Sequence, residues 1–282
     1  QTVRDDGPQT HLKKNGTPTM GGIIFLLAVL ITSLIYAPHY PKVIPILFMT
    51  VGFGIVGFLD DFIKVVLHRS EGLTPAQKMA GQLVVTAVFA YYMVNISDVG
   101  LTMLVPFFPE ISINLGWLSI PLLFFVVIGT VNGTNFTDGL DGLAASVTVM
   151  VAVFFSVVAI GTDAGIAPVT LAVAGGLMGF LLFNVYPASV FMGDTGSLAL
   201  GGFVAATAYM MNMPLFILLV GFIYLVEVLS VIIQVTYFKA THGKRFSKMA
   251  PIHHHFEKCG WSETRVVATF SIITALCCLR SE

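Results

Sequence analysis

The sequence has few charged residues. Asp, Glu, Lys and Arg make up 10% of its 282 residues, whereas about 25% is usual in soluble domains. Together with 56% hydrophobic residues, this excludes a water-soluble globule and a disordered chain. The net charge is only -1, so no basic surface for a nucleic-acid partner is expected.

Cysteine is also scarce, and its positions exclude two further classes of fold. Cys259, Cys277 and Cys278 have no paired spacing, and the last two are adjacent within an apolar run. Neither a disulfide framework nor a zinc ribbon fits this pattern, which favours a packing role.

Long apolar runs dominate the chain. A bilayer core about 30 Å thick needs about 20 apolar residues in a helix. Nine apolar runs approach that length, with Glu227 as their one charged residue: 21–37, 43–59, 80–95, 115–131, 143–161, 166–185, 196–211, 214–238 and 266–279. They predict an all-α polytopic membrane protein with nine transmembrane helices, in which residues 1–282 form a single integral membrane domain.

The basic residues predict the orientation. If the residues before Gly21 are cytoplasmic, 12 of the 14 Lys and Arg fall in cytoplasmic loops or helix ends, as positive-inside topology requires. These are Arg4, Lys13, Lys14, Lys64, Arg69, Lys78, Lys239, Lys244, Arg245, Lys248, Lys258 and Arg265. On the other side, residues 99–105 and 110–115 predict a small extracytoplasmic β-hairpin, since the second segment alternates polar and apolar residues.

Aspartates next to apolar helices are functional candidates, because charge is costly at membrane depth. Asp60 and Asp61 end one predicted helix, with Lys64 on their face. Adjacent carboxylates suit a hard divalent cation and the lysine suits a phosphate, although a solvated helix end with a local ion pair is the alternative.

A second cluster lies in VNGTNFTDGLDGLAAS, which spaces four polar side chains three residues apart. Asn132, Asn135, Asp138 and Asp141 would share a broad helical face. Helix capping at Leu143 would use one of them, so capping leaves the rest unexplained and ligand binding is favoured.

A third cluster, NVYPASVFMGDTGSLALG, contains Asn184, Phe191 and Asp194. Asp194 could cap the following helix, but the neighbouring aromatic residue also suits stacking on a base or sugar.

The histidine run His253, His254 and His255 favours phosphate binding or proton handling over zinc, because consecutive side chains diverge. Glu227, within the run 214–238, favours a buried interhelical hydrogen bond.

Apart from Glu227, these groups fall on the predicted cytoplasmic face. Carboxylates for a metal, lysines, asparagines and glycine turns at a membrane surface indicate phosphoryl transfer, which depends on charge neutralisation and alignment. A soluble nucleotide-linked donor and a lipid phosphate could meet there.

Five motifs in order, GTPTMGG, LDDFIK, NGTNFTDGLDGLA, FMGDTGSLALGG and MAPIHHHFE, resemble the phospho-N-acetylmuramoyl-pentapeptide transferase family. The resemblance implies a homodimer in the bacterial cytoplasmic membrane, with ten spans per chain, the first preceding Gln1. It implies Mg²⁺ as cofactor, UDP-MurNAc-pentapeptide and undecaprenyl phosphate as substrates, and a possible target for nucleoside antibiotics.

Carried over to this chain, the family motifs assign roles to single residues. Asp194 would bind the metal, and Asp60 or Asp61 would be the nucleophile or base, in a catalytic group that includes His254 and His255. The implied substrate-binding residues are Lys14, Thr19, Lys64, Lys78, Asn132, Asn135, Asp138, Gly139, Leu140, Asp141, Asn184, Phe191 and His253.

Two alternative functions remain open from the sequence. A sister transferase that moves GlcNAc-1-phosphate onto a polyprenyl phosphate would share the carboxylates. A secondary transporter would instead need acidic groups near the bilayer midplane, where the sequence places only Glu227.

Overall fold

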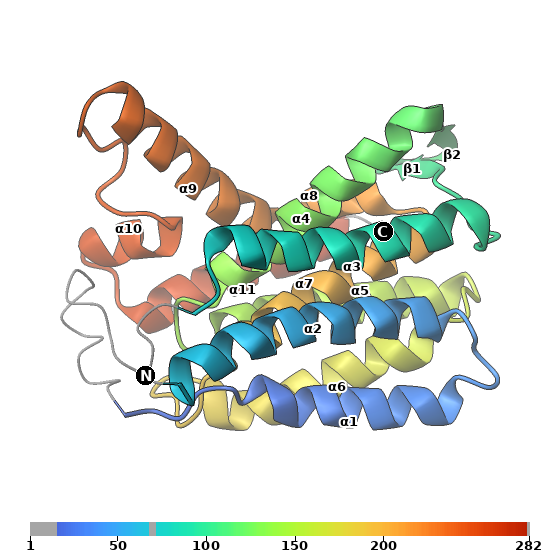
Figure 1. The fold of residues 1–282 in the computed structure, drawn as a ribbon, viewed down its shortest axis with the longest axis horizontal. Helices are drawn as coiled ribbons and strands as arrows, with labels where there is room; N and C mark the ends of the chain where they lie inside the picture. The colour runs from blue at the N-terminus through green and yellow to red at the C-terminus, as the bar shows by residue number, and fades with distance from the viewer. Residues whose placement is uncertain (1–15, 68–71, 281–282) are drawn as a thin grey trace.

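The computed structural model describes residues 16–67 and 72–280. Helices dominate it, and the first six long ones are α1 (Gly22–Tyr36), α2 (Val43–Val65), α3 (Pro75–Asn95), α4 (Ser119–Thr137), α5 (Leu143–Gly161) and α6 (Ala167–Asn184). They are followed by α7 (Gly193–Met210), α8 (Ile217–Val220), α9 (Phe222–Ala240), α10 (Ile252–Lys258) and α11 (Glu263–Arg280), with short 3₁₀ turns at Gly116–Leu118 and Pro214–Phe216. Figure 1 shows most of the long helices packed in one bundle, from which α9 projects.

Among the described residues, five helical segments are long and apolar enough to cross a membrane. They are Val43–Val65, Gly116–Thr137, Leu143–Gly161, Ala167–Asn184 and Phe222–Ala240. The chain is therefore a mostly helical, multi-pass membrane protein. Each of the nine predicted runs overlaps a helix, but run 214–238 is not continuous, because Gly221 leaves the helical region (φ -94°, ψ 20°) between α8 and α9.

Helix α7 forms the centre of the bundle. All sixteen of its residues from Thr195 to Met210 are buried, and it packs against α2 and α4. Glycine allows these contacts: a Cβ at Gly201 would lie 2.5 Å from the Val131 Cα of α4, and one at Gly202 would lie 2.7 Å from the Met49 carbonyl oxygen of α2. Small residues let helix backbones approach closely, as membrane bundles require.

The predicted hairpin is present, with a shorter first strand than expected and a second strand that begins two residues earlier than expected. Strands β1 (Met103–Val105) and β2 (Phe108–Ile113) pair antiparallel, with a register shift between Leu104 and Val105. The hairpin lies at the end of the bundle opposite α10 (Figure 1). Helix α9 projects away from the other helices and buries only Ile223, Tyr224 and Glu227.

The close contact between α7 and α4 can be tested by adding a single methyl group. We expect Gly201→Ala to destabilise the protein by about 1–3 kcal/mol, because the new Cβ would overlap the α4 backbone. Thermal unfolding in detergent measures this change. Gly175→Ala is the matched control, since no atom lies within 4 Å of a Cβ built there. Equal unfolding temperatures for the two variants would contradict this packing.

Candidate active site

Three carboxylates from two helices meet at one end of the bundle. Asp60 and Asp61 lie near the end of α2, and Asp194 lies in the first turn of α7. One potential ligand oxygen from each lies within 4.8 Å of the other two. A site of this kind needs compensating positive charge, because three carboxylates in close contact repel one another.

Two lysines supply that charge. Lys64 forms an ion pair with Asp60, and its Nζ lies 3.2 Å from Asp194 Oδ2. Lys78 Nζ, from the first turn of α3, lies 2.9 Å from the same oxygen. The side chains of Lys64 and Asp194 are 41% and 20% exposed, so the cluster is open to a ligand from outside the bundle.

The start of α3 places Lys78. Thr74 caps this helix in a reciprocal capping box with Gln77, and Pro75 occupies the first helical position. Just before it, the Leu73 backbone N–H donates to Asp60 Oδ1 at 2.7 Å. Asp60 of α2 thus fixes the position of the segment that leads into α3.

An asparagine on α4 orients the other side of Asp194. Asn135 Nδ2 lies 3.0 Å from Asp194 Oδ1 and 2.8 Å from Ser197 Oγ, and Asn135 Oδ1 accepts a 3.4 Å hydrogen bond from Lys78. Both oxygens of Asp194 therefore have partners, supplied by three different helices, α2, α3 and α4.

Asp61 binds the start of α7. Its Oδ2 accepts hydrogen bonds from the Thr195 backbone N–H (2.8 Å) and Thr195 Oγ1 (2.7 Å), and its Oδ1 accepts one from the Asp194 N–H (3.2 Å). A carboxylate at a helix N-terminus satisfies free N–H groups and interacts favourably with the helix dipole. Asp61 thus caps α7 from α2, whereas the sequence had offered Asp194 as the cap.

The GTPTMGG motif docks directly against FMGDTGS. The Phe191 N–H donates to the Pro18 carbonyl at 2.9 Å, and Gly21 and Gly22 donate back to Phe191 and Met192 at 2.8 and 3.0 Å. A Cβ at Gly22 would lie 2.5 Å from Gly196 Cα. This pairing requires glycine at the start of α1.

Thr19 lies next to the carboxylates, because it and Asp61 approach the same residue, Gly193. A Cβ built at Gly193 would lie 3.1 Å from Thr19 Oγ1 and 2.5 Å from Asp61 Oδ2. Lys14 lies outside the described residues.

The DGLDG turn joins α4 to α5 beside this cluster. Asp138 follows the last residue of α4, and Leu140 is buried. The Asp141 N–H donates to Glu263 Oε1 of α11 at 2.7 Å, and Asp141 Oδ2 accepts from the Ala188 N–H at 2.9 Å. Gly142 opens α5 with φ +78° and no side-chain cap, so the capping interpretation of this motif is wrong.

Two predicted binding asparagines make contacts within the protein. Asn184 Nδ2, at the end of α6, donates to the Val190 carbonyl at 2.9 Å, while its buried Oδ1 has no hydrogen-bond partner among the described residues. Asn132 forms a reciprocal amide pair with Gln82 of α3, at 2.9 and 3.3 Å. The pair lies one turn from Lys78 and Asn135 and fixes the register of α3 against α4.

The three histidines have different hydrogen-bond partners, but the rings of His253 and His254 do not diverge as their sequence spacing predicts, since their centroids lie 4.1 Å apart. His253 is fully buried, and its Nδ1 lies 3.0 Å from Glu227 Oε1. His254 Nδ1 lies 2.7 Å from Glu257 Oε2, and His255 Nδ1 accepts a 3.1 Å hydrogen bond from the Lys248 N–H. These contacts within the described residues do not join the histidines to the carboxylate cluster.

Four residues that complete the site were not among the predicted site residues. Gln82, Thr195 and Ser197 hold the cluster, and Glu263 holds the DGLDG turn. Gln82 had a signal, because it lies four residues after Lys78 on the same helical face. Glu263 had none, since its partner is 122 residues away.

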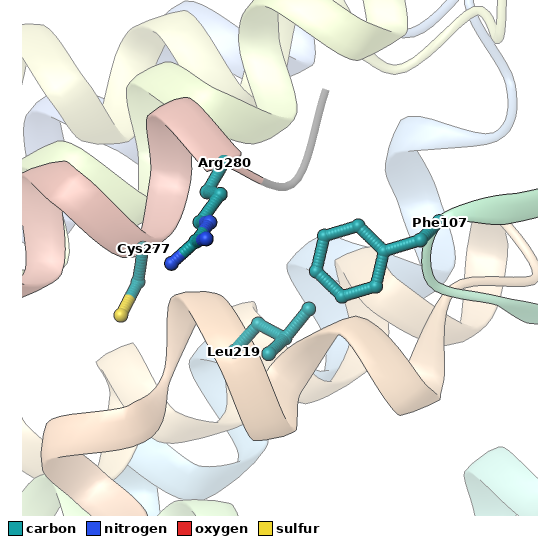
Figure 2. Close-up of a pocket in the computed structure, with 4 residues that line it drawn as sticks. All are labelled: Phe107, Leu219, Cys277 and Arg280. Atoms are coloured by element: carbon teal, nitrogen blue, oxygen red, sulfur yellow. The ribbon is translucent and has the colours of Figure 1, made fainter.

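Two cavities of about 540 Å³ lie near the hairpin end of the bundle. Figure 2 shows one of them, in which Arg280 and Cys277 of α11 face Leu219 of α8 and Phe107 of the hairpin turn. The other lies between α1 and the α5–α6 connection and includes Tyr36 and Asp163, among other residues. Neither cavity is lined by a predicted site residue.

Comparisons with known proteins agree with this arrangement of motifs. Residues 43–212 match glycosyl transferase family 4, and residues 14–26 match phospho-N-acetylmuramoyl-pentapeptide-transferase signature 1. The phospho-N-acetylmuramoyl-pentapeptide-transferase of Acetivibrio thermocellus is 54% identical over 99% of this chain and 84% of its own length. The chain belongs to the phospho-N-acetylmuramoyl-pentapeptide-transferase family.

Two further relatives carry the same name. That of Clostridioides difficile is 53% identical over 98% of this chain and 86% of its own length. That of Clostridium botulinum is 51% identical over 99% of this chain and 86% of its own length. Membership of this family supports a transferase and argues against the transporter alternative.

The Gln82–Asn132 pair provides a test of a structural role against a binding role. We expect Asn132→Ala to lower the free energy of unfolding by about 1–3 kcal/mol, because it leaves the buried Gln82 amide without its partner. The exchange Gln82→Asn with Asn132→Gln should recover part of that stability, since it restores one amide opposite the other. Thermal unfolding measures both variants. A stable Asn132→Ala protein with weakened donor binding would support the original substrate-binding prediction instead.

Proposed function

We propose that the protein transfers phospho-MurNAc-pentapeptide from its UDP carrier to undecaprenyl phosphate, releasing UMP and forming the first lipid-linked intermediate of peptidoglycan. The observation that carries the proposal is the convergence of Asp60, Asp61 and Asp194 with Lys64 and Lys78 at one end of the bundle. The relatives named above support the identity of the donor sugar.

The proposed step is a direct displacement at phosphorus. An oxygen of the lipid phosphate attacks the sugar-bearing phosphorus, and the bond from that phosphorus to the bridging oxygen breaks, so UMP leaves with the bridging oxygen. In this step Lys64 and Lys78, which pair with Asp194 in the structure, neutralise the charge of the phosphates. Positioning and electrostatics suffice for such a step, so no aspartyl-phosphate intermediate is required.

The three carboxylates have different proposed roles. Asp194 and Asp60 face the reacting phosphates, while Asp61 fixes the first turn of α7 that carries Asp194. Asp61 is then a positioning residue, because its two oxygens already accept three hydrogen bonds from α7.

A magnesium ion fits this donor set. Mg²⁺ prefers oxygen ligands, and carboxylates are the only anionic groups in the cluster. Asp194 would hold the ion with help from Asp60. When bound, the ion supplies charge neutralisation for the transferred phosphoryl group.

The remaining residues would form the nucleotide pocket and the cleft around it. We assign the uridine side to the DGLDG turn with Asn184 and Phe191, whose segments the fold places near the start of α7. The groups in this assignment are Lys14, Thr19, Asn135, Asp138, Gly139, Leu140, Asp141, Asn184 and Phe191, with His254 and His255 lining the cleft. His253 is fully buried, so it does not line the cleft itself.

The proposed topology has nine transmembrane segments in one membrane domain, with the carboxylate cluster facing the cytoplasm and the hairpin facing outward. The distribution of Lys and Arg supports this orientation. Assembly as a homodimer and inhibition by nucleoside antibiotics are proposed on the family resemblance alone.

The first experiment measures UMP release by the purified protein with undecaprenyl phosphate and Mg²⁺, comparing UDP-MurNAc-pentapeptide with UDP-GlcNAc. We expect release from the muramoyl donor only, lost on chelation. Asp194→Asn should lower turnover at least about 100-fold, because it removes a charged metal ligand. The exposed Glu110→Gln, in the hairpin, is the matched control. Release from UDP-GlcNAc alone would assign the protein to the sister branch.

A labelling experiment tests the topology. Cys259 is exposed beside α10, so in a Cys277→Ser, Cys278→Ser background it is the single thiol of the chain. We expect an impermeant thiol reagent to modify it in inside-out vesicles and not in intact cells. Ser112→Cys in the hairpin, with Cys259→Ser added, should show the reverse. Modification of Cys259 in intact cells would reverse the proposed orientation.

A further inference from the structure

A buried acid and a buried histidine form a pair that the reaction above does not use. Neither Glu227 of α9 nor His253 of α10 has exposed surface, and His253 Nδ1 lies 3.0 Å from Glu227 Oε1. Glu227 Oε2 and His253 Nε2 are also buried and have no hydrogen-bond partner among the described residues. Burying such groups is costly, so an arrangement that retains them calls for an explanation beyond packing.

The pair lies where α9 leaves the bundle. Glu227 is the last buried residue of α9, and the rest of that helix projects outward (Figure 1). One turn earlier, the Tyr224 hydroxyl lies 2.7 Å from Thr148 Oγ1 of α5. The backbone of α9 at the same residue packs closely on α4, since the Tyr224 carbonyl oxygen would be 2.6 Å from a Cβ at Gly133. Glu227 is therefore held on a rigid part of the helix.

The chain returns from the projecting end of α9 through a loop that leads into α10. Gln234 Oε1 accepts hydrogen bonds from the Phe246 and Ser247 N–H groups, at 3.1 and 2.9 Å, which ties this loop to α9. His253 is the buried residue of α10 and points back to Glu227. Glu227 on α9 thus fixes the ring of His253, which belongs to a separate helix, α10.

The far side of the imidazole contacts the DGLDG turn. A Cβ built at Gly139 would lie 2.2 Å from His253 Nε2 and 2.6 Å from Cε1, so the ring packs against the Gly139 backbone. The same turn is held from its other side by Glu263, through the Asp141 N–H. The turn thus lies between His253 of α10 and Glu263 of α11, and Glu227 holds the His253 side chain.

We propose that Glu227 is a positioning residue for the donor nucleotide: it accepts a hydrogen bond from the Nδ1–H of His253 and thereby holds the ring against Gly139, which sets the shape of the Asp138–Gly142 turn. This inference rests on the proposed function, which gives that turn to the nucleotide. Glu227 is fully buried, so it acts only through His253. A carboxylate bound to one ring nitrogen fixes both the orientation and the tautomer of a histidine.

Kinetics separate this role from a general effect on folding. We expect Glu227→Ala to raise the KM for UDP-MurNAc-pentapeptide about tenfold, in the range seen when an orienting partner is removed, with the KM for undecaprenyl phosphate unchanged. Glu227→Gln should retain most donor binding, because its amide oxygen can still accept a hydrogen bond from the Nδ1–H. Tyr224→Phe is the matched control: it removes a buried hydrogen bond one turn away and should lower the unfolding temperature without changing the donor KM.

Two kinetic results would overturn the proposal. One is a lower kcat in Glu227→Ala with an unchanged donor KM, and the other is an equal rise of the donor KM in Tyr224→Phe. Either result would show that Glu227 stabilises the fold without positioning the donor nucleotide.

A second measurement is independent of turnover. In protein labelled with ¹⁵N-histidine, the His253 signal, identified by its loss in His253→Gln, should show a protonated Nδ1 in the wild type. An unprotonated Nδ1 would overturn the proposal even if Glu227→Ala fails to fold. Failure of the proposed function would appear differently, as wild-type protein that keeps this signal but releases no UMP from the muramoyl donor.

Discussion

The hydrogen bonds from the start of α7 to the Asp61 carboxylate are the constraint on which the site depends. Helix α7 is buried along nearly its whole length, so its first N–H groups need a partner inside the protein. Asp61 supplies that partner from α2, and the same contact brings Asp194 next to Asp60. The same contact therefore packs α7 against α2 and brings the three carboxylates together.

Charge compensation explains the shape of the surrounding structure. Three carboxylates at the end of apolar helices repel one another unless cations lie close to them, and Lys64 and Lys78 supply these cations. The lysines stay in place only if α2 and α3 keep a fixed register relative to α4 and α7. The Gln82–Asn132 pair provides that register between α3 and α4. Glycines on α7 allow the backbones of α2 and α4 to approach closely, and both helices supply partners to Asp194.

The donor side of the proposed site uses a different kind of support. The DGLDG turn has few large side chains of its own, so residues of other segments hold it. Glu263 accepts a hydrogen bond from the Asp141 N–H, and the His253 ring packs against Gly139. Of the three consecutive histidines, His253 is the one whose ring is fixed from α9, while His254 and His255 have partners in their own segment. One short motif thus contains residues with different tasks.

The sequence by itself determined the membrane class, the approximate helices, the hairpin, the family and most of the polar residues that cluster, because apolar run length and local motifs depend on nearby residues alone. It could not determine that Asp61 caps α7, that Asn132 pairs with Gln82, or that run 214–238 breaks at Gly221. It also gave no sign that Glu227 reaches His253. These decisions belong to the tertiary structure, since each depends on a contact between helices, or on backbone geometry, that no local spacing encodes.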